Sequence, residues 1–235
     1  MALSPRLILA SSSPRRRQLL KRFNIPFEVI ESGLREDVPP HLSPQRLVVR
    51  LSQLKARAVA DMHEKPNQPT LILGADTTID LDGSVLGKPQ DAEDARRMLS
   101  QLRGRSHQVI TGVCLILLPA NRTLAGAVST TVRMKEFTKP QRDSYVQSGE
   151  PMGKAGSYAI QGLGGELVES ISGCYRNVVG LPLCEVRRML EELLGRPLAS
   201  KAVCDLPSGE PCPREKRGTS GKAAKPQRVR KGEKS

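Results

Sequence analysis

The sequence LILASSSPRRRQLL, residues 7–20, contains a short apolar run, a polar turn and the start of a helical pattern. Leu7 to Ala10 are apolar and predict a buried strand. Ser13 followed by Pro14 is typical of a helix start, because the serine hydroxyl caps free backbone N–H groups and proline fits the first helical position. A strand running directly into a helix predicts an α/β fold.

The arginines of this stretch occupy an unusual position for positive charge. Arg15, Arg16 and Arg17 fall in the first helical turn, where the helix dipole disfavours each cation by roughly 0.3–1 kcal/mol. A bound anion would offset this cost, since backbone N–H groups, the hydroxyls of Ser11 and Ser13 and the guanidinium groups converge there. We therefore expect a phosphate site; the alternative is a solvated basic turn.

Strand and helix patterns alternate along the rest of the chain. Apolar or alternating runs predict strands at residues 27–30, 70–73, 104–118, 121–132 and 166–171, the second of them ending at the glycine of residues 74–77. Helical spacing predicts helices over residues 43–59, 91–102, 140–148 and 182–194. Asp82-Gly83 predicts a hairpin turn, and the glycine-rich residues 149–165 predict a loop. Because hairpins exclude a purely parallel sheet, the expected class is α/β with a mixed sheet.

Composition divides the chain into two parts. Residues 199–235 lack aromatic side chains, and their ten basic and four acidic residues give +6 of the total formal charge of +13. Low hydrophobicity with net charge is typical of disorder. We expect one domain at residues 1–198, followed by a basic, disordered tail at 199–235.

The basic charge makes a nucleic-acid-binding protein the alternative to an enzyme that acts on nucleotides. Proteins that bind single strands stack bases on aromatic side chains, whereas this chain has no tryptophan and only three phenylalanines and three tyrosines. Nucleic acid is therefore an unlikely ligand except through the tail.

Cysteine and histidine spacing indicates the type of metal site. The five cysteines and three histidines are widely spaced, and no CxxC pair occurs. This pattern predicts neither a disulfide framework nor a zinc site, and it fits a reducing compartment. Any metal is expected to be held by oxygen ligands, which favours Mg²⁺ or Mn²⁺.

Localisation is expected to be cytoplasmic, with no membrane contact. No run approaches the roughly 20 apolar residues of a membrane span. Residues 1–27 contain arginine and serine but no acid before Glu28, which is also typical of a mitochondrial transit peptide. The same residues supply the predicted strand and phosphate turn, so we expect them to remain in the mature protein.

Asp76 is the catalytic candidate. It follows an apolar strand and Gly74, a common location for active-site groups in α/β folds. A carboxylate there can hold a divalent metal or orient a water molecule; the alternative is an aspartate that only forms a turn.

Further candidates are polar residues on glycine-rich or helical segments. Lys88, on the turn Gly87-Lys88-Pro89, and Lys154 are candidates for binding phosphate. Gln161 has an amide suited to reading a base edge. Glu36 and Lys55 are weaker candidates, as a metal ligand and as a supporting residue, because single charges of this kind are usually solvated.

Several blocks of the sequence occur in the same order as in one known family. They are Ala10-Ser11-Ser12-Ser13-Pro14-Arg15-Arg16, Gly74-Ala75-Asp76-Thr77, Gly87-Lys88-Pro89, residues 104–113, Lys154-Ala155-Gly156-Ser157-Tyr158, Ile160-Gln161-Gly162 and residues 177–182. Together they resemble the Maf family of nucleoside triphosphate pyrophosphatases over about residues 6–195. Thr78 in place of the usual valine, and Leu34-Arg35 before Glu36, depart from the family pattern.

The resemblance implies an ITPase-like fold of the Maf type, with a twisted mixed sheet flanked by helices around a central cleft, often as a homodimer. It implies hydrolysis of dTTP and UTP to the monophosphate and pyrophosphate, with a divalent metal and Asp76 as proton acceptor. Arg15, Thr77 and Gln161 match positions linked to substrate choice in this branch; the alternative is the sister branch, which acts on 7-methyl-GTP.

Overall fold

A single mixed β-sheet forms the centre of the protein. The computed structural model describes residues 5–34, 42–63, 66–198, 204–205, 212 and 227–228. In this part of the chain the strands follow the order β2-β1-β3-β5-β6-β7-β8, with β4 paired to β3. Their bounds are β1 Arg6–Ala10, β2 Glu28–Val29, β3 Thr70–Leu81, β4 Ser84–Leu86, β5 Ser106–Leu118, β6 Arg122–Met134, β7 Val168–Ser172 and β8 Gln227–Arg228.

The direction of the strands confirms the mixed α/β class. β1 lies parallel to β2 and β3, whereas β3, β5, β6, β7 and β8 pair antiparallel. The predicted hairpin at Asp82-Gly83 is present as the β3–β4 turn.

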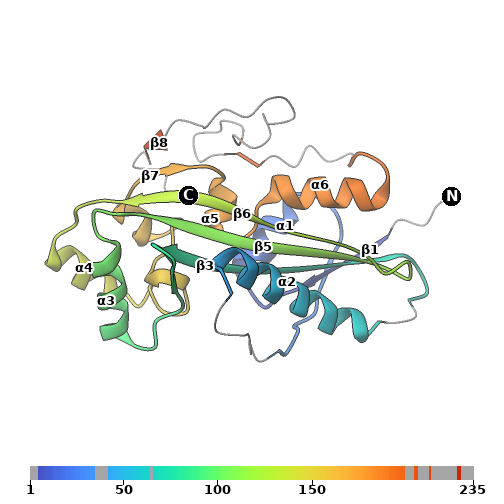
Figure 1. Ribbon diagram of the computed structural model, residues 1–235, viewed down its shortest axis with the longest axis horizontal. Coiled ribbons are helices and arrows are strands. Elements are labelled where there is room, and N and C mark those ends of the chain that lie inside the picture. Colours follow the sequence, from blue (N-terminus) through green and yellow to red (C-terminus); the bar gives the residue numbers. More distant parts are fainter. Residues whose placement is uncertain are drawn as a thin grey trace.

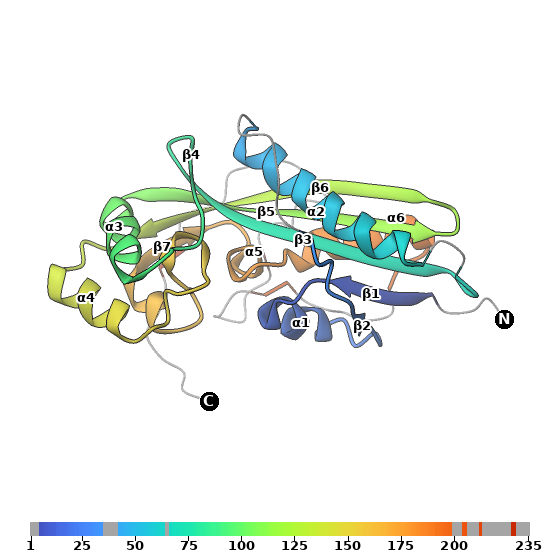
Figure 2. The same ribbon diagram turned by 90° about the horizontal axis from the view of Figure 1, so that it is seen from below.

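Helices cover both faces of the sheet (Figures 1 and 2). α2 lies on one face, over an apolar cluster that includes Ile8, Ile72 and Ile116. α1 and α6 lie on the other face, over the larger core. The bounds are α1 Pro14–Lys21, α2 Pro44–Asp61, α3 Ala92–Leu102, α4 Lys139–Gln147, α5 Tyr175–Val179 and α6 Leu183–Leu194.

Helices α1, α2 and α3 begin where the sequence predicts. Ser13 caps α1 and Ser43 caps α2, each accepting a hydrogen bond from the backbone N–H three residues later. Asp91 caps α3 in the same way, at 2.8 Å. These side chains satisfy N–H groups that have no partner inside the helix.

The prediction that a strand ends at Gly74 is wrong. β3 continues to Leu81, and it pairs with β5 without interruption from Thr70↔Leu118 to Asp80↔Gln108. Gly74 permits close packing rather than a turn, because a Cβ atom there would lie 2.2 Å from the backbone oxygen of Ser52 in α2. Asp76 is therefore in the middle of a long strand.

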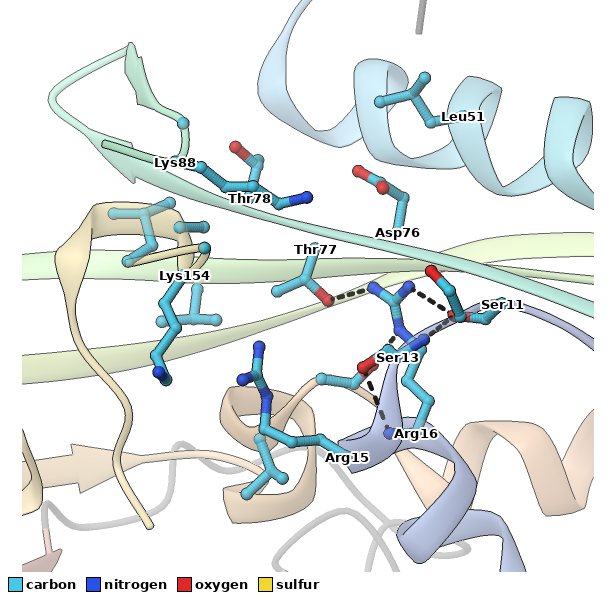
Figure 3. Close-up of a pocket in the computed structure, with 18 of the residues that line it drawn as sticks. Ser11, Ser13, Arg15, Arg16, Leu51, Asp76, Thr77, Thr78, Lys88 and Lys154 are labelled. Carbon is cyan, nitrogen blue, oxygen red and sulfur yellow. Dashed lines mark hydrogen bonds between the residues drawn. The ribbon is translucent and has the colours of Figure 1, made fainter. Parts of the chain in front are cut away.

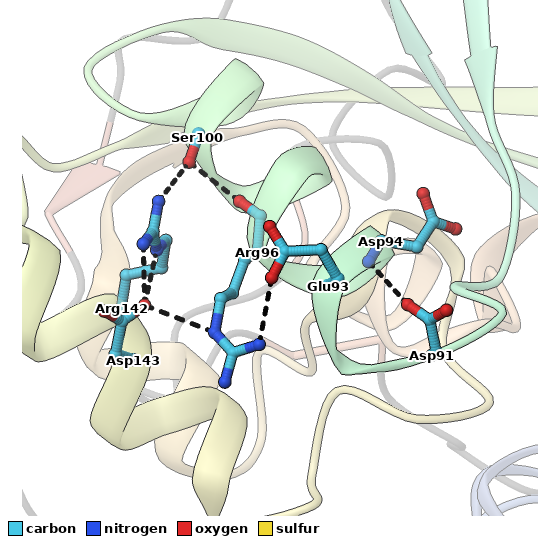
Figure 4. A network of polar contacts seen from close by, with 7 residues as sticks. All are labelled: Asp91, Glu93, Asp94, Arg96, Ser100, Arg142 and Asp143. Atoms are coloured by element: carbon cyan, nitrogen blue, oxygen red, sulfur yellow. Dashed lines mark hydrogen bonds and ion pairs between the residues drawn. The ribbon is translucent and has the colours of Figure 1, made fainter.

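Polar contacts join α3 and α4 beyond one end of the sheet (Figure 4). Asp143 accepts hydrogen bonds from Arg142 and forms an ion pair with Arg96 at 3.5 Å. Arg142 also donates to Ser100 Oγ at 2.7 Å. The glycine-rich segment between α4 and β7 includes two short 3₁₀ turns, η1 Ala155–Ser157 and η2 Leu163–Leu167.

The predicted tail lies largely outside the described residues. Of its positions, Asp205 forms ion pairs with Arg22 at 2.9 Å and Arg176 at 2.6 Å, and β8 pairs with β7. The division at residue 198 stays a prediction. Among the described residues, no helix has the length and apolar character needed to cross a membrane.

Candidate active site

A cleft of about 990 Å³ lies where β1 and β3 meet α1, α2, α5 and the loop before η1 (Figure 3). Ten of the predicted site residues line it: Ser11, Ser13, Arg15, Arg16, Lys55, Asp76, Thr77, Lys88, Lys154 and Gln161. Glu36, the weaker metal candidate, lies outside the described residues. Residues up to 150 positions apart in the sequence thus meet in one cavity.

The serine turn forms one wall of this cleft. Ser11, which is buried, accepts a hydrogen bond from the Ser13 backbone N–H at 3.3 Å. Ser13 Oγ accepts from the Arg16 backbone N–H at 3.5 Å. The turn is therefore ordered by its own hydroxyls, and it directs the first turn of α1 at the cleft.

Arg16 connects three walls of the cleft. Its guanidinium group donates to the Gly180 carbonyl at 3.0 Å, to Ser11 Oγ at 3.3 Å and to Thr77 Oγ1 at 3.0 Å. The planar fork of an arginine suits such simultaneous contacts, and lysine would not reproduce them. Arg16 thus fixes the relative positions of α1, β3 and the end of α5.

Arg15 points into the cleft and approaches the loop on the opposite side. Figure 3 shows Arg15 and Lys154 extending into the same part of the cavity. Burial and the Arg15 charge lower the pKa of Lys154, while Glu150 acts in the opposite direction. Two cations held this close favour an anionic ligand between them.

Asp76 and Lys55 form the central ion pair. Lys55 Nζ donates to Asp76 Oδ1 at 2.6 Å, and each side chain is only 13% exposed. The expectation that Lys55 is a solvated surface charge is wrong. A carboxylate accepts several hydrogen bonds, so this contact leaves capacity for a water molecule or a metal ion.

The α2 helix brings Lys55 to Asp76 because glycine lies opposite Asp76 in the sheet. Gly112 pairs with Asp76 across β3 and β5. A Cβ atom at Gly112 would lie 2.2 Å from the Val48 carbonyl oxygen of α2. The missing side chain thus lets the helix backbone approach the sheet closely.

Thr77 belongs to a buried hydrogen-bond chain that the sequence did not reveal. Its hydroxyl lies 3.0 Å from Thr111 Oγ1, which donates to the Asn177 carbonyl at 3.2 Å. The Asn177 amide donates to the Val109 carbonyl and to Thr130 Oγ1, at 2.8 and 3.0 Å. This chain ties β3, β5, β6 and α5 together behind the cleft.

Lys88 and Gln161 lie at the more open part of the cleft, and both are exposed. The loop that carries Lys154 is attached to the Lys88 turn by a Gly156 N–H to Gly87 O hydrogen bond of 2.9 Å. Glu31, which the sequence analysis did not single out, also lines the cleft. It follows β2, and a solitary acid after so short a strand gave no signal.

The chain is similar to known proteins over most of its length. The family model described as Maf-like protein matches residues 6–193. A protein named dTTP/UTP pyrophosphatase from Syntrophotalea carbinolica is 46% identical over 187 residues, covering 80% of this chain and 84% of the relative. A protein of the same name from Ruminiclostridium cellulolyticum is 47% identical over 189 residues, covering 80% and 95%.

Likeness to solved structures is weak. The Staphylococcus aureus Ham1 protein superposes with a TM-score of 0.39 and 16% identity, over 56% of this chain and 72% of that one. A similarity at that level carries no argument about fold or function. The match to residues 6–193 and the identity of 46% and 47% over 84% and 95% of two relatives are decisive, and they establish that this chain belongs to the Maf family.

Proposed function

We propose that this chain hydrolyses dTTP and UTP to the nucleoside monophosphate and pyrophosphate, in a housecleaning role for the nucleotide pool. The observation that carries the proposal is the partly buried Asp76–Lys55 pair in a cleft lined by four further basic side chains. Two relatives of 46% and 47% identity that are named dTTP/UTP pyrophosphatase support the choice of substrate.

Charge supports the placement of the triphosphate. Arg15, Lys88 and Lys154 line the cleft, and a triphosphate needs several cations to offset its negative charge. The N–H groups at the start of α1 and the hydroxyls of Ser11 and Ser13 supply neutral donors beside them. Arg16 contributes positive charge while it holds the walls together.

Asp76 is proposed to act on the attacking water. Oxygen from water bonds to the α-phosphorus, the bond from that phosphorus to the α–β bridging oxygen breaks, and pyrophosphate leaves with the bridging oxygen. The water proton passes to the Asp76 carboxylate, a form of base catalysis that contributes about 10²–10⁴-fold. The 2.6 Å hydrogen bond from Lys55 fixes the orientation of the carboxylate.

The oxygen ligands in the cleft fit Mg²⁺ or Mn²⁺. Asp76 and Glu31 both line it, and Mg²⁺ is commonly held by one or two carboxylates together with substrate phosphates. These two side chains would hold the ion, which when bound neutralises charge on the phosphate oxygens. Glu36 stays a predicted ligand.

Gln161 is proposed to read the base. Its amide can donate to O4 and accept from N3–H of uracil or thymine. Its exposed position at the open part of the cleft fits contact with a base whose triphosphate lies deeper. If neighbouring groups fix the orientation of the amide, a base with the reversed donor and acceptor pattern leaves buried polar groups of the complex unpaired, at a cost of about 1–3 kcal/mol each.

A panel of nucleotides tests the proposal. The purified protein is assayed with Mg²⁺ or Mn²⁺ on dTTP, UTP, CTP, ATP, GTP and 7-methyl-GTP, with pyrophosphate and orthophosphate measured separately. We expect preference for dTTP and UTP, with pyrophosphate released in one step. A preference for 7-methyl-GTP would assign the sister branch, and release of single orthophosphates would overturn the reaction class.

Two further proposals concern the oligomeric state, which rests on the family resemblance, and the location, which rests on a cysteine pattern that fits a reducing compartment. We infer a homodimer, which sedimentation equilibrium would test: a mass of 25.7 kDa, that of one chain, would contradict it. We also infer a cytoplasmic location, and import of a fluorescent fusion into mitochondria would contradict that inference.

A further inference from the structure

Four of the five cysteines meet on the side of the sheet that carries α5 and α6. The sulfur atoms of Cys174, Cys184, Cys204 and Cys212 all lie within 4.8 Å of one another. Cys184 is partly exposed, and the other three are buried. All five cysteines are among the described residues, and none is in a disulfide.

These cysteines come from three separate parts of the chain. Cys174 precedes α5 and caps it, and Cys184 lies in the first turn of α6. Cys204 and Cys212 belong to the C-terminal segment, where the Cys212 N–H donates to the Cys204 carbonyl at 2.7 Å. The spacing matches no common zinc pattern, which is why the sequence did not predict a thiolate site.

The separations fit one tetrahedral ion. Zinc binds thiolate at about 2.3 Å, so the sulfurs of a tetrahedral site are about 3.8 Å apart. The Cys174 and Cys204 sulfurs are 3.2 Å apart, and the largest separation is within 4.8 Å. A disulfide needs about 2.05 Å and would leave the other two sulfurs crowded beside it. An iron–sulfur cluster needs room for several irons and sulfides between its ligands.

The chemistry of the cluster also calls for a cation. Four thiolates this close together, three of them buried, do not coexist without a positive charge among them. Binding of Zn²⁺ with release of four thiol protons gives a thiolate complex of net charge −2, and the positive N-terminal end of the twelve-residue α6 lies beside Cys184.

We propose that Cys174, Cys184, Cys204 and Cys212 bind one structural zinc ion, which fastens the C-terminal segment to α5 and α6. Four protein ligands close the coordination sphere, as in structural rather than catalytic zinc sites. The site lies apart from the nucleotide cleft, since none of its four cysteines lines that cavity. It is independent of the proposed hydrolysis.

Metal analysis of the full-length protein tests this proposal. The protein is expressed with zinc in the medium, purified with a phosphine reductant and analysed by plasma mass spectrometry. We expect one zinc per chain in the wild type and none in the double variant Cys204→Ser/Cys212→Ser. Cys114→Ala is the matched control, because Cys114 lies in the core under α2, and it should retain the zinc.

Cobalt binding and chelator sensitivity of the wild type test the proposal even if the variants do not fold. Cobalt exchanged into the wild type should give the visible absorption typical of tetrahedral thiolate ligands. A strong zinc chelator should lower the Tm of the wild type and leave that of the double variant unchanged. Absence of zinc and of cobalt uptake under reducing conditions, zinc retained by the double variant, a Cys174–Cys204 disulfide in peptide mapping, or bound iron with sulfide would each overturn the proposal.

Discussion

Asp76 owes its position to contacts on both sides of its strand. Its carboxylate is held by Lys55 from α2, while the next residue, Thr77, contacts Arg16 and Thr111 on the other face of β3. Successive side chains of a strand point to opposite faces. The strand therefore presents the proposed base to the cleft and anchors the adjacent residue to the arginine at the start of α1.

Replacing Asp76 with asparagine tests whether Asp76 acts as the catalytic base. Asp76→Asn keeps the size of the side chain but cannot take a proton from water. We expect kcat on UTP to fall by about 10² or more, with KM changed little because the basic phosphate-binding residues remain. Steady-state kinetics measure both values.

Asp80→Asn is the matched control, since Asp80 lies on the same strand and accepts a hydrogen bond from the Gly83 N–H at 2.7 Å. An asparagine oxygen can accept the same bond. Near-normal turnover in Asp76→Asn would remove Asp76 from the mechanism, and an equal loss in the control would indicate a general effect on the strand.

His107 makes the stability of the protein depend on pH. It is 3% exposed, its Nε2 lies 2.7 Å from the Tyr158 hydroxyl, and its Nδ1 has no partner among the described residues. Burial lowers the pKa of His107 to about 4. An unfolded histidine has a pKa near 6.5, so between these values the unfolded chain binds a proton that the folded chain does not.

Stability should therefore be complete above pH 6.5 and decrease as the pH falls towards 4. At pH 5 the loss from this residue is on the order of 2 kcal/mol relative to pH 7. Chemical denaturation at both pH values measures it. In His107→Phe the difference should shrink by that amount, whereas His63→Gln, which changes a partly exposed histidine, should retain it. An unchanged difference in His107→Phe would contradict the prediction.

Helix α2 is the element that completes the site. It lies across the sheet (Figure 2), and it approaches closely because Gly74 and Gly112 have no side chains between the two backbones. The same approach brings Lys55 within 2.6 Å of Asp76. Packing and catalysis thus depend on the same contact.

Gly112→Ala tests this dependence. The added Cβ would lie 2.2 Å from the Val48 carbonyl oxygen, and backbone atoms of a helix cannot move aside as a flexible side chain can. Overpacking of this kind costs roughly 1–3 kcal/mol, which corresponds to a decrease in Tm of about 3–10 °C for a protein of this size. Because α2 must shift, kcat should also fall.

Gly126→Ala provides the matched control on β6. A Cβ there would meet the end of the Met189 side chain at 3.4 Å, and methionine adapts readily. Thermal denaturation and kinetics of the two variants should differ clearly. Equal values would show that α2 tolerates displacement from the sheet.

Elements with long periodic patterns were predictable from the sequence, whereas the short elements α5 and β8 were not. α2, α3 and α6 have apolar positions at helical spacing, and caps mark α2 and α3. α5 has five residues and β8 has two, too few for periodicity to appear. Gly74 was misread because the sequence does not distinguish a glycine that ends a strand from one that admits a neighbouring helix.

In the site, too, residues marked by a local sequence pattern were predictable, whereas contacts between residues far apart in the sequence were not. Ser11, Ser13 and Asp76 were found because each follows an apolar run of the sequence within a few residues. The Lys55–Asp76 ion pair and the Thr77–Thr111 hydrogen bond join different elements, so no local pattern indicates them. The cysteine cluster likewise has no local pattern, since its members are separated by up to 38 positions in the sequence.

At the scale of the whole molecule, the C-terminal segment returns to the domain that precedes it. Asp205 lies between Arg22 and Arg176, and β8 adds to the sheet next to β7. Of the described residues, those that line the cleft all lie between Ala10 and Gly180. The described residues of the segment can therefore contribute to stability without contributing a side chain to the site.

A chain ending at Leu198 tests this separation of roles. It lacks the Asp205 ion pairs and two of the clustered cysteines, and its formal charge falls from +13 to +7, because the removed residues carry ten basic and four acidic side chains. We expect hydrolysis of UTP within a few-fold of the full-length rate, a lower Tm, and weaker binding to heparin.

Full-length Asp205→Asn separates the ion pairs from the rest of the segment, and its Tm should lie between those of the full-length wild type and the shortened chain. If hydrolysis disappeared with the segment while the shortened chain stayed folded, residues after 198 would belong to the catalytic unit. If heparin affinity were unchanged, the basic charge that binds polyanions would lie on the domain instead.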